Sequence, residues 1–190
     1  MTARNHKIGK GILIKQPSIL HWRSLARLFA RSFPYLSAAD RSYCVREYGS
    51  TTWLAFNRGE LAGFFTLLLN KSPGVCWIEY VAVDPRFRLS RVALALMDRM
   101  DEEAIRLGYN RLEGAVRRDN VKAISFYLKC GWYEVPKEGL HLTYAKDLKA
   151  SSNPIRPAQS AFAASVLGRA LRNIFYRLAT VRTSDQKSDF

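Results

Sequence analysis

The stretch VAVDPRFRLSRVALALM, residues 81–97, contains a change from one apolar pattern to another. A continuous apolar run ends at Asp84-Pro85, and after a basic segment apolar residues recur at the spacing of a helix. A strand that leads into a helix N-terminus is a general anion site, because free N–H groups and the helix dipole face the turn. Four residues there add charge or a hydroxyl: Arg86, Arg88, Ser90 and Arg91. The segment is either a phosphate-binding turn or a charged loop, and it lacks the glycine that phosphate turns usually contain.

Strand and helix patterns alternate along the chain on both sides of this stretch. Strands are predicted over residues 11–16, 51–56, 61–69, 75–83, 111–116, 132–135 and 140–148. Helices are predicted over residues 18–33, 37–48, 91–107 and 119–131. Antiparallel hairpins come first and a β-α-β crossover follows them. We therefore expect an α+β (mixed α/β) fold, with a mostly antiparallel twisted sheet of about seven strands and about four flanking helices.

The C-terminal part has a different composition from this predicted domain, which spans residues 1–149. Residues 150–159 combine Ser, Asn and Pro as linkers do, and residues 183–190 are predicted to be disordered. Between them, residues 160–182 form an amphipathic basic helix pattern. Such a helix packs on its own domain or a second copy, lies on an anionic membrane surface, or contacts nucleic acid.

The charge of the chain is strongly positive and uneven. The formal net charge is +14, which favours acidic partners such as phosphorylated cofactors, nucleic acid or an anionic membrane. No Asp or Glu precedes Asp40, although the same segment carries seven basic residues: Arg4, Lys7, Lys10, Lys15, Arg23, Arg27 and Arg31. Such a bias marks either an interaction face or a solvated surface.

The cysteines and histidines indicate neither a disulfide framework nor a metal site. Cys44, Cys76 and Cys130 are odd in number and widely spaced, which favours reduced thiols in a cytoplasmic compartment. The three histidines have no metal-ligand spacing with them. The N-terminus has no secretion-signal pattern, and the longest apolar run is shorter than the roughly 20 residues that span a bilayer. We expect a cytoplasmic protein that is soluble or peripherally membrane-associated.

Two blocks, WIEYVAVDPRFRLSRVALALM and EGAVRRDNVKAISFYLKCGWYEV, carry a family resemblance. The first fits a strand ending V-x-P and a turn (Arg or Gln)-x-x-Gly-x-(Gly or Ala), at Val83, Pro85, Arg88, Arg91, Val92 and Ala93. The second fits Asn-x-x-Ala-x-x-(Phe or Leu)-Tyr-x-x-x-Gly-(Phe or Trp), at Asn120, Ala123, Phe126, Tyr127, Gly131 and Trp132. Together they resemble the GNAT superfamily of N-acetyltransferases over roughly residues 11–148, and the order of predicted elements agrees with that fold.

The resemblance implies acetyl-CoA as cosubstrate, with no metal. It implies cosubstrate contacts at Val81, Ala82, Val83, Arg88, Leu89, Ser90, Arg91, Val92, Ala93, Asn120 and Tyr127. A strand N–H near Val81 would polarise the thioester carbonyl, and Asn120 would contact the pantetheine, cap its helix, or do both.

Arg91 departs from the family pattern, because it stands where the family has Gly. Glycine permits a left-handed backbone and close approach to an anion, and arginine permits neither easily. If the backbone is right-handed at Arg91, its N–H still donates and its guanidinium can reach phosphate oxygens. If the side chain fills the turn instead, binding is weakened or lost.

Acetyl transfer to an amine needs a base for the amine and an acid for the departing thiolate. Tyr127 matches the family tyrosine assigned to protonating the thiolate, although a tyrosine beside Phe126 also fits a packed core. Glu79, an ionisable residue inside an apolar strand, is the first candidate base, and Glu113 is the alternative. Either carboxylate could instead pair with an arginine.

The sequence therefore predicts a GNAT-type N-acetyltransferase that transfers acetyl directly from acetyl-CoA, because no Cys occupies a nucleophile setting. The acceptor is a primary amine of a small molecule, a protein N-terminus or a lysine. The alternative is a GNAT-derived adaptor that has lost catalysis through the Arg91 turn and binds a membrane or nucleic acid. Leu89 and the high apolar content leave a longer acyl group open.

Overall fold

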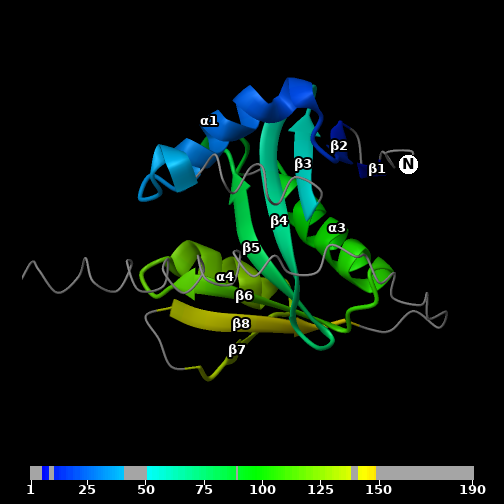
Figure 1. Cartoon of the computed structure of the whole chain (residues 1–190), viewed down its shortest axis with the longest axis vertical. Coiled ribbons are helices and arrows are strands. Elements are labelled where there is room, and N and C mark those ends of the chain that lie inside the picture. Colours follow the sequence, from blue (N-terminus) through cyan, green and yellow to red (C-terminus); the bar gives the residue numbers. More distant parts are fainter. Residues whose placement is uncertain (1–5, 9–10, 41–50, 89, 138–140, 149–190) are drawn as a thin grey trace, which may run out of the picture. The chain divides into compact units, whose positions relative to one another are not determined.

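A single eight-stranded sheet forms the centre of the computed structural model, which describes residues 6–8, 11–40, 51–88, 90–137 and 141–148 (Figure 1). Across the sheet the strands are β1 (His6–Ile8), β2 (Ile12–Lys15), β3 (Thr52–Asn57), β4 (Glu60–Ser72), β5 (Val75–Val83), β6 (Arg111–Arg117), β8 (His141–Asp147) and β7 (Tyr133–Val135). Every neighbouring pair is antiparallel except β5 and β6. The predicted α+β class is confirmed, and β1 is a strand that the sequence patterns did not predict.

Three α-helices and two short 3-10 helices have their bounds within the described residues, and they follow the predicted order. They are η1 (Ile19–His21), α1 (Trp22–Ser32), η3 (Pro85–Phe87), α3 (Val92–Arg106) and α4 (Val121–Lys129). Of the helix predicted over residues 37–48, residues 38–40 are helical and residues 41–48 lie outside the described residues. The predicted linker, basic helix and tail (residues 150–190) also lie outside them.

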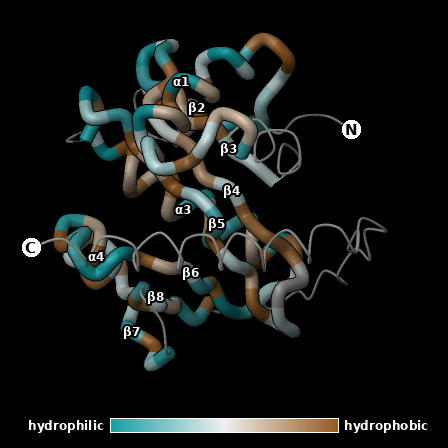
Figure 2. The backbone as a smooth tube through the Cα atoms, turned by 60° about the vertical axis from the view of Figure 1, so that its left-hand side comes forward, coloured by the Kyte–Doolittle hydropathy of each residue, from teal (hydrophilic) through white to brown (hydrophobic). Residues whose placement is uncertain are grey.

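Apolar side chains are buried on both faces of the sheet. Strand β3 shows this alternation: Trp53 and Ala55 join the cluster beneath α3, while Leu54 and Phe56 join the cluster beneath α1. The α1 cluster includes Leu28, Phe29 and Phe64, and the α3 cluster includes Leu96, Met100 and Phe65. Figure 2 shows much of β4 coloured as hydrophobic, as expected of a strand covered on both faces. The central strands are therefore fixed from both sides.

Strands β5 and β6 pair only over their first halves and then separate. Their parallel register runs from Val75 opposite Arg111 to Ile78 opposite Gly114, and then stops. At this point Glu79 is the extra residue of a β-bulge against β4, since Thr66 pairs with Tyr80 and Leu67 with Ile78. The bulge reverses the alternation of β5 side chains between the two faces of the sheet, so that Ile78 and Val81 both pack on the α3 cluster. Figure 1 shows the two strands diverging beyond it.

The opening between the separated strands is where a site is expected. Both strands run in the same direction, and each leads directly into a helix: β5 into α3 and β6 into α4. The two helix N-termini consequently lie at the open end of the split, the usual ligand position at the carboxyl ends of parallel strands.

Candidate active site at the split between β5 and β6

The turn between β5 and α3 has the geometry of an anion site. Asp84 leads into η3, and the Ser90 N–H and hydroxyl both donate to the Phe87 carbonyl, at 3.1 and 2.6 Å. The first bond of the α3 ladder joins the Ala95 N–H to the Arg91 carbonyl, so the N–H groups of residues 92–94 lie outside the ladder. Of the predicted turn residues, Arg88 and Arg91 are exposed, Ser90 and Ala93 are half-buried and Val92 is buried, and Leu89 lies outside the described residues.

Arg91 adopts a left-handed backbone conformation, which glycine accepts at low cost. Its φ of 62° and ψ of 1° place it in the left-handed region, at the N-cap of α3. The right-handed conformation considered from the sequence is therefore wrong. The Arg91 side chain is exposed, so the turn keeps its shape in spite of the Cβ. An L-residue in this conformation costs about 1–2 kcal/mol, so the rest of the structure must hold the turn in place.

Asp84 is the buried group that braces this turn, and no sequence pattern marks it as such. It is 1% exposed and accepts hydrogen bonds from the Arg86 N–H, at 3.0 Å, and from Arg31 Nη2 on α1, at 2.8 Å. Burial acts to raise the pKa of Asp84, but the hydrogen bonds from Arg86 and the charge of Arg31 outweigh it, so the pKa lies below its ordinary value. The ionised carboxylate thus ties the turn to α1.

A close approach of α3 to the sheet depends on Gly63 of β4. A Cβ at this position would lie 2.8 Å from the Ala82 carbonyl oxygen and 3.3 Å from a methyl group of Val92. Residue 63 faces the first turn of α3, so any side chain there would displace the N-terminus of that helix. This glycine had no counterpart in the predicted motif, because its role lies in a contact between distant segments.

Helix α4 carries Tyr127, and hydrogen bonds define both ends of this helix. Asn120 caps the helix, accepting the Ala123 N–H at 3.2 Å, which confirms the capping role considered for it. At the other end the Trp132 N–H donates to the Tyr127 carbonyl and the Gly131 N–H to the Leu128 carbonyl, with Gly131 at a φ of 80°. This is a Schellman motif, and it explains why a glycine stands four residues after Tyr127.

The ring of Tyr127 is held by two aromatic neighbours. Its centroid lies 4.9 Å from that of Trp132, edge-on, and 6.1 Å from that of Tyr144, stacked. Burial raises the pKa of the Tyr127 hydroxyl well above its ordinary value, and the nearby Cys130 adds to this effect. The hydroxyl therefore remains protonated at neutral pH and can donate. Packing and a proton-donor role are compatible at this residue.

The two candidate carboxylates differ in their surroundings. Glu79 is half-buried at the bulge where β5 leaves β6. Glu113 of β6 is 8% exposed and accepts from Arg111 Nε at 3.0 Å and from Lys137 Nζ at 2.6 Å. Two cationic side chains thus hold the oxygens of Glu113, which favours the ion-pair role considered for it. Val81, Ala82 and Val83 continue β5 beyond Glu79, half-buried along the strand edge that faces away from β4.

Two further features concern the described part of the chain. No group of three or more His, Cys, Asp or Glu side chains there could hold a metal ion. Among the same residues, no helix combines the length and hydropathy needed to cross a bilayer.

Solved structures resemble this fold over nearly their whole length. Ard1 of Thermoplasma volcanium has 24% identity and a TM-score of 0.64, with 73% of this chain and 99% of that chain covered. The PaiA N-acetyltransferase of Thermoplasma acidophilum, in complex with coenzyme A, has 18% identity and a TM-score of 0.58, with coverage of 72% and 98%. The ribosomal-protein-S18-alanine N-acetyltransferase of Escherichia coli has 19% identity and a TM-score of 0.60, with 75% of this chain and 97% of that chain covered. At these identities the likeness establishes the fold.

Sequence comparison identifies the family. No curated protein matches the chain, but residues 18–132 match the family model described as Acetyltransferase (GNAT) family. The match spans more than half of the 190 residues and includes the first block and the second block as far as Trp132. With the split sheet and the two helix N-termini at its open end, this match shows that the chain belongs to the acetyltransferase (GNAT) family.

Proposed function

We propose that this acetyltransferase transfers the acetyl group of acetyl-CoA directly to a primary amine, of a small molecule, a protein N-terminus or a lysine. Family membership establishes the acyltransferase reaction and acetyl-CoA as the donor. The single observation that carries the proposal is the turn at residues 84–91, whose backbone is left-handed at Arg91, where the family pattern has glycine. This favours an active enzyme over an adaptor that has lost the donor site.

The residues of the turn fit the diphosphate of the donor. The N–H groups of Val92, Ala93 and Leu94 precede the first ladder bond of α3, and the helix dipole adds partial positive charge. The exposed guanidinium groups of Arg88 and Arg91 can form charge-assisted hydrogen bonds with phosphate oxygens. Asp84 lies beneath the turn and keeps its backbone in place, so these donors are arranged before the ligand arrives.

Along the split, the edge of β5 from Val81 to Val83 would hold the donor. This edge has no partner strand in the described part of the sheet, so its backbone groups are available to a pantetheine chain. Acetyl-CoA, when bound, supplies the activated acyl group as a thioester. Asn120, which caps α4, lies at the N-terminus of that helix, on the β6 side of the split.

Glu79 is the proposed base, and Tyr127 the proposed acid. Glu79 stands at the bulge where the strands separate, so a carboxylate there is close to the open end of the split. Glu113 is disfavoured as the base because Arg111 and Lys137 both hold its oxygens. The Tyr127 hydroxyl, protonated at neutral pH, would donate its proton to the departing thiolate.

An acceptor screen tests this proposal. The full chain is incubated with acetyl-CoA and panels of amines, peptides with free N-termini and lysine peptides, and free thiol is measured. Thiol release that requires an amine, together with an acetylated amine identified by mass spectrometry, is the expected result. Amine-dependent release without an acetylated product, or acetylation of no acceptor while acetyl-CoA binds normally, would contradict direct transfer to an amine.

A further inference from the structure

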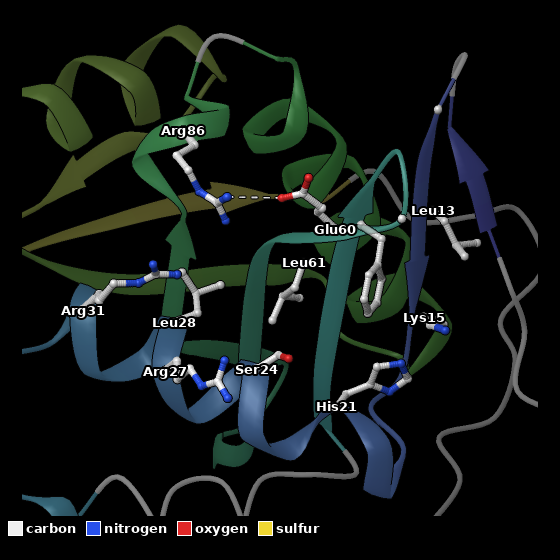
Figure 3. A pocket seen from close by; sticks show the side chains of 13 residues that line it. Leu13, Lys15, His21, Ser24, Arg27, Leu28, Arg31, Glu60, Leu61 and Arg86 are labelled. Carbon is white, nitrogen blue, oxygen red and sulfur yellow. Dashed lines mark hydrogen bonds and ion pairs between the residues drawn. The ribbon is translucent and has the colours of Figure 1, made fainter.

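An open pocket lies on the α1 side of the sheet, away from the split between β5 and β6. Its volume is about 640 Å³, within the range of small-molecule sites. Four segments line it: β2, the η1–α1 helix, the β3–β4 turn, and η3 through Arg86. Figure 3 shows Ser24, Arg27 and Arg31 projecting from α1, with Arg86 and Glu60 facing them. We propose that this pocket binds a small phosphorylated ligand at a site separate from that of acetyl-CoA.

The pocket has more cations than its carboxylates can neutralise. Lys15, Arg27, Arg31 and Arg86 line it, and Glu60 is the acidic residue among its lining residues. Glu60 accepts a hydrogen bond from Arg86 Nη1 at 3.2 Å. The buried Asp84 accepts hydrogen bonds from both Arg31 and Arg86.

Lys15 and Arg27 are the cations left over. Lys15 lies over the ring of Phe56, 4.8 Å from its centroid, and neither it nor Arg27 has a carboxylate partner among the described residues. The excess positive charge in the pocket therefore favours binding of an anionic ligand from solution.

His21 adds a neutral donor to this wall. Its Nδ1 accepts the Ser18 backbone N–H at 2.9 Å and lies 2.8 Å from the Ser18 hydroxyl. An Nδ1 that accepts an N–H carries a lone pair, so the ring proton of the neutral histidine resides on Nε2. Burial, and then the charge of Lys15, lower the pKa of His21, which keeps it in this form at neutral pH.

The donor set matches phosphate oxygens. The Arg27 guanidinium, the Lys15 ammonium group and the His21 imidazole line the pocket from separate elements, and a guanidinium can bind phosphate with two parallel hydrogen bonds. Three of the seven basic residues that precede the first acidic residue, Lys15, Arg27 and Arg31, line this pocket. The pocket thus explains part of the charge bias, and of these three residues Arg31 also braces the donor turn through Asp84.

Calorimetric titration of the full chain with inorganic pyrophosphate tests the proposal, with and without saturating coenzyme A. Binding is expected in both conditions, since Arg86 is the one lining residue of the pocket that belongs to the donor turn, and Asp84 and Glu60 hold its guanidinium. Arg27→Gln should weaken pyrophosphate binding by about tenfold or more, because it removes charge-assisted hydrogen bonds. The matched control is Arg23→Gln on the same helix, which removes the same charge outside the pocket and should change affinity by less than about twofold.

Several results would overturn the proposal. One is the absence of pyrophosphate binding by the wild-type chain, even if single-stranded RNA or an acidic peptide binds. Another is binding that coenzyme A abolishes and Arg27→Gln leaves unchanged, which would place pyrophosphate on the donor turn. Equal weakening by Arg23→Gln and Arg27→Gln would indicate a diffuse charge effect. A second pocket variant, Lys15→Gln, and thermal unfolding curves distinguish loss of the ligand from loss of the fold. If the chain fails to bind coenzyme A, the titrations without it still decide between these results.

Discussion

Replacing Arg91 by glycine should stabilise the chain in the absence of ligand. The residue has a φ of 62°, which costs an L-amino acid about 1–2 kcal/mol. Glycine removes this cost, but the unfolded chain gains freedom worth about 0.5–1 kcal/mol. The net expectation is a free energy of unfolding higher by about 0.5–1 kcal/mol, and for a chain of this size a rise in Tm of about 1–4 °C.

A second substitution separates the backbone from the side chain. Arg91→Ala removes the guanidinium and its unfavourable charge at the helix N-terminus, but it keeps the Cβ that causes the strain. Thermal and urea unfolding of the wild type and both variants, without ligand, give the comparison. We expect the free energy of unfolding of Arg91→Gly to exceed that of Arg91→Ala by about 1 kcal/mol. Equal stability of the two variants, or a lower Tm for Arg91→Gly than for the wild type, would refute a left-handed backbone at this position.

Three further predictions concern the site. Asp84→Asn should lower the free energy of unfolding at pH 7 by about 1–3 kcal/mol, because buried charge-assisted hydrogen bonds are lost. The pKa of Asp84 is depressed in the fold, so its contribution is present above the unfolded pKa of about 3.9 and disappears as pH falls through the folded pKa. Stability curves that stay separated in strong acid would contradict this. Tyr127→Phe should lower kcat about a hundredfold or more with little change in acetyl-CoA affinity, since the buried ring is kept; an unchanged kcat in the thiol-release assay would remove the acid role. Glu79→Gln should lower kcat at neutral pH and lose less activity at high pH, where the amine is already neutral. Glu113→Gln should instead reduce stability and leave kcat nearly unchanged. If Glu113→Gln lowers kcat and Glu79→Gln does not, Glu113 is the base and Glu79 is not.

Local sequence patterns were enough to predict most elements and both family blocks. The run at residues 75–83 is a strand over the same residues, because an apolar run between turns is sufficient to specify it. Helix α4 and its end at Gly131 follow from the cap at Asn120 and a glycine that accepts a positive φ.

Features that depend on distant contacts could not be predicted in this way. Asp84 acts as a brace only because Arg31, 53 residues earlier, reaches it across the sheet. The sequence ranks Glu79 before Glu113 as a base but does not show that Lys137 reaches Glu113 or that Glu79 lies at a bulge. The basic pocket likewise draws its cations from segments that are far apart in the chain.

Calorimetric titration with acetyl-CoA, comparing the full wild-type chain with Arg91→Glu, tests the central claim most directly. Glutamate keeps a side chain at the left-handed position and reverses the charge facing the diphosphate. A functional donor turn predicts micromolar, one-to-one binding by the wild type and at least about tenfold weaker binding by the variant. Failure of the wild type to bind millimolar acetyl-CoA, or equal affinity of the two proteins, would contradict a donor site built on this turn.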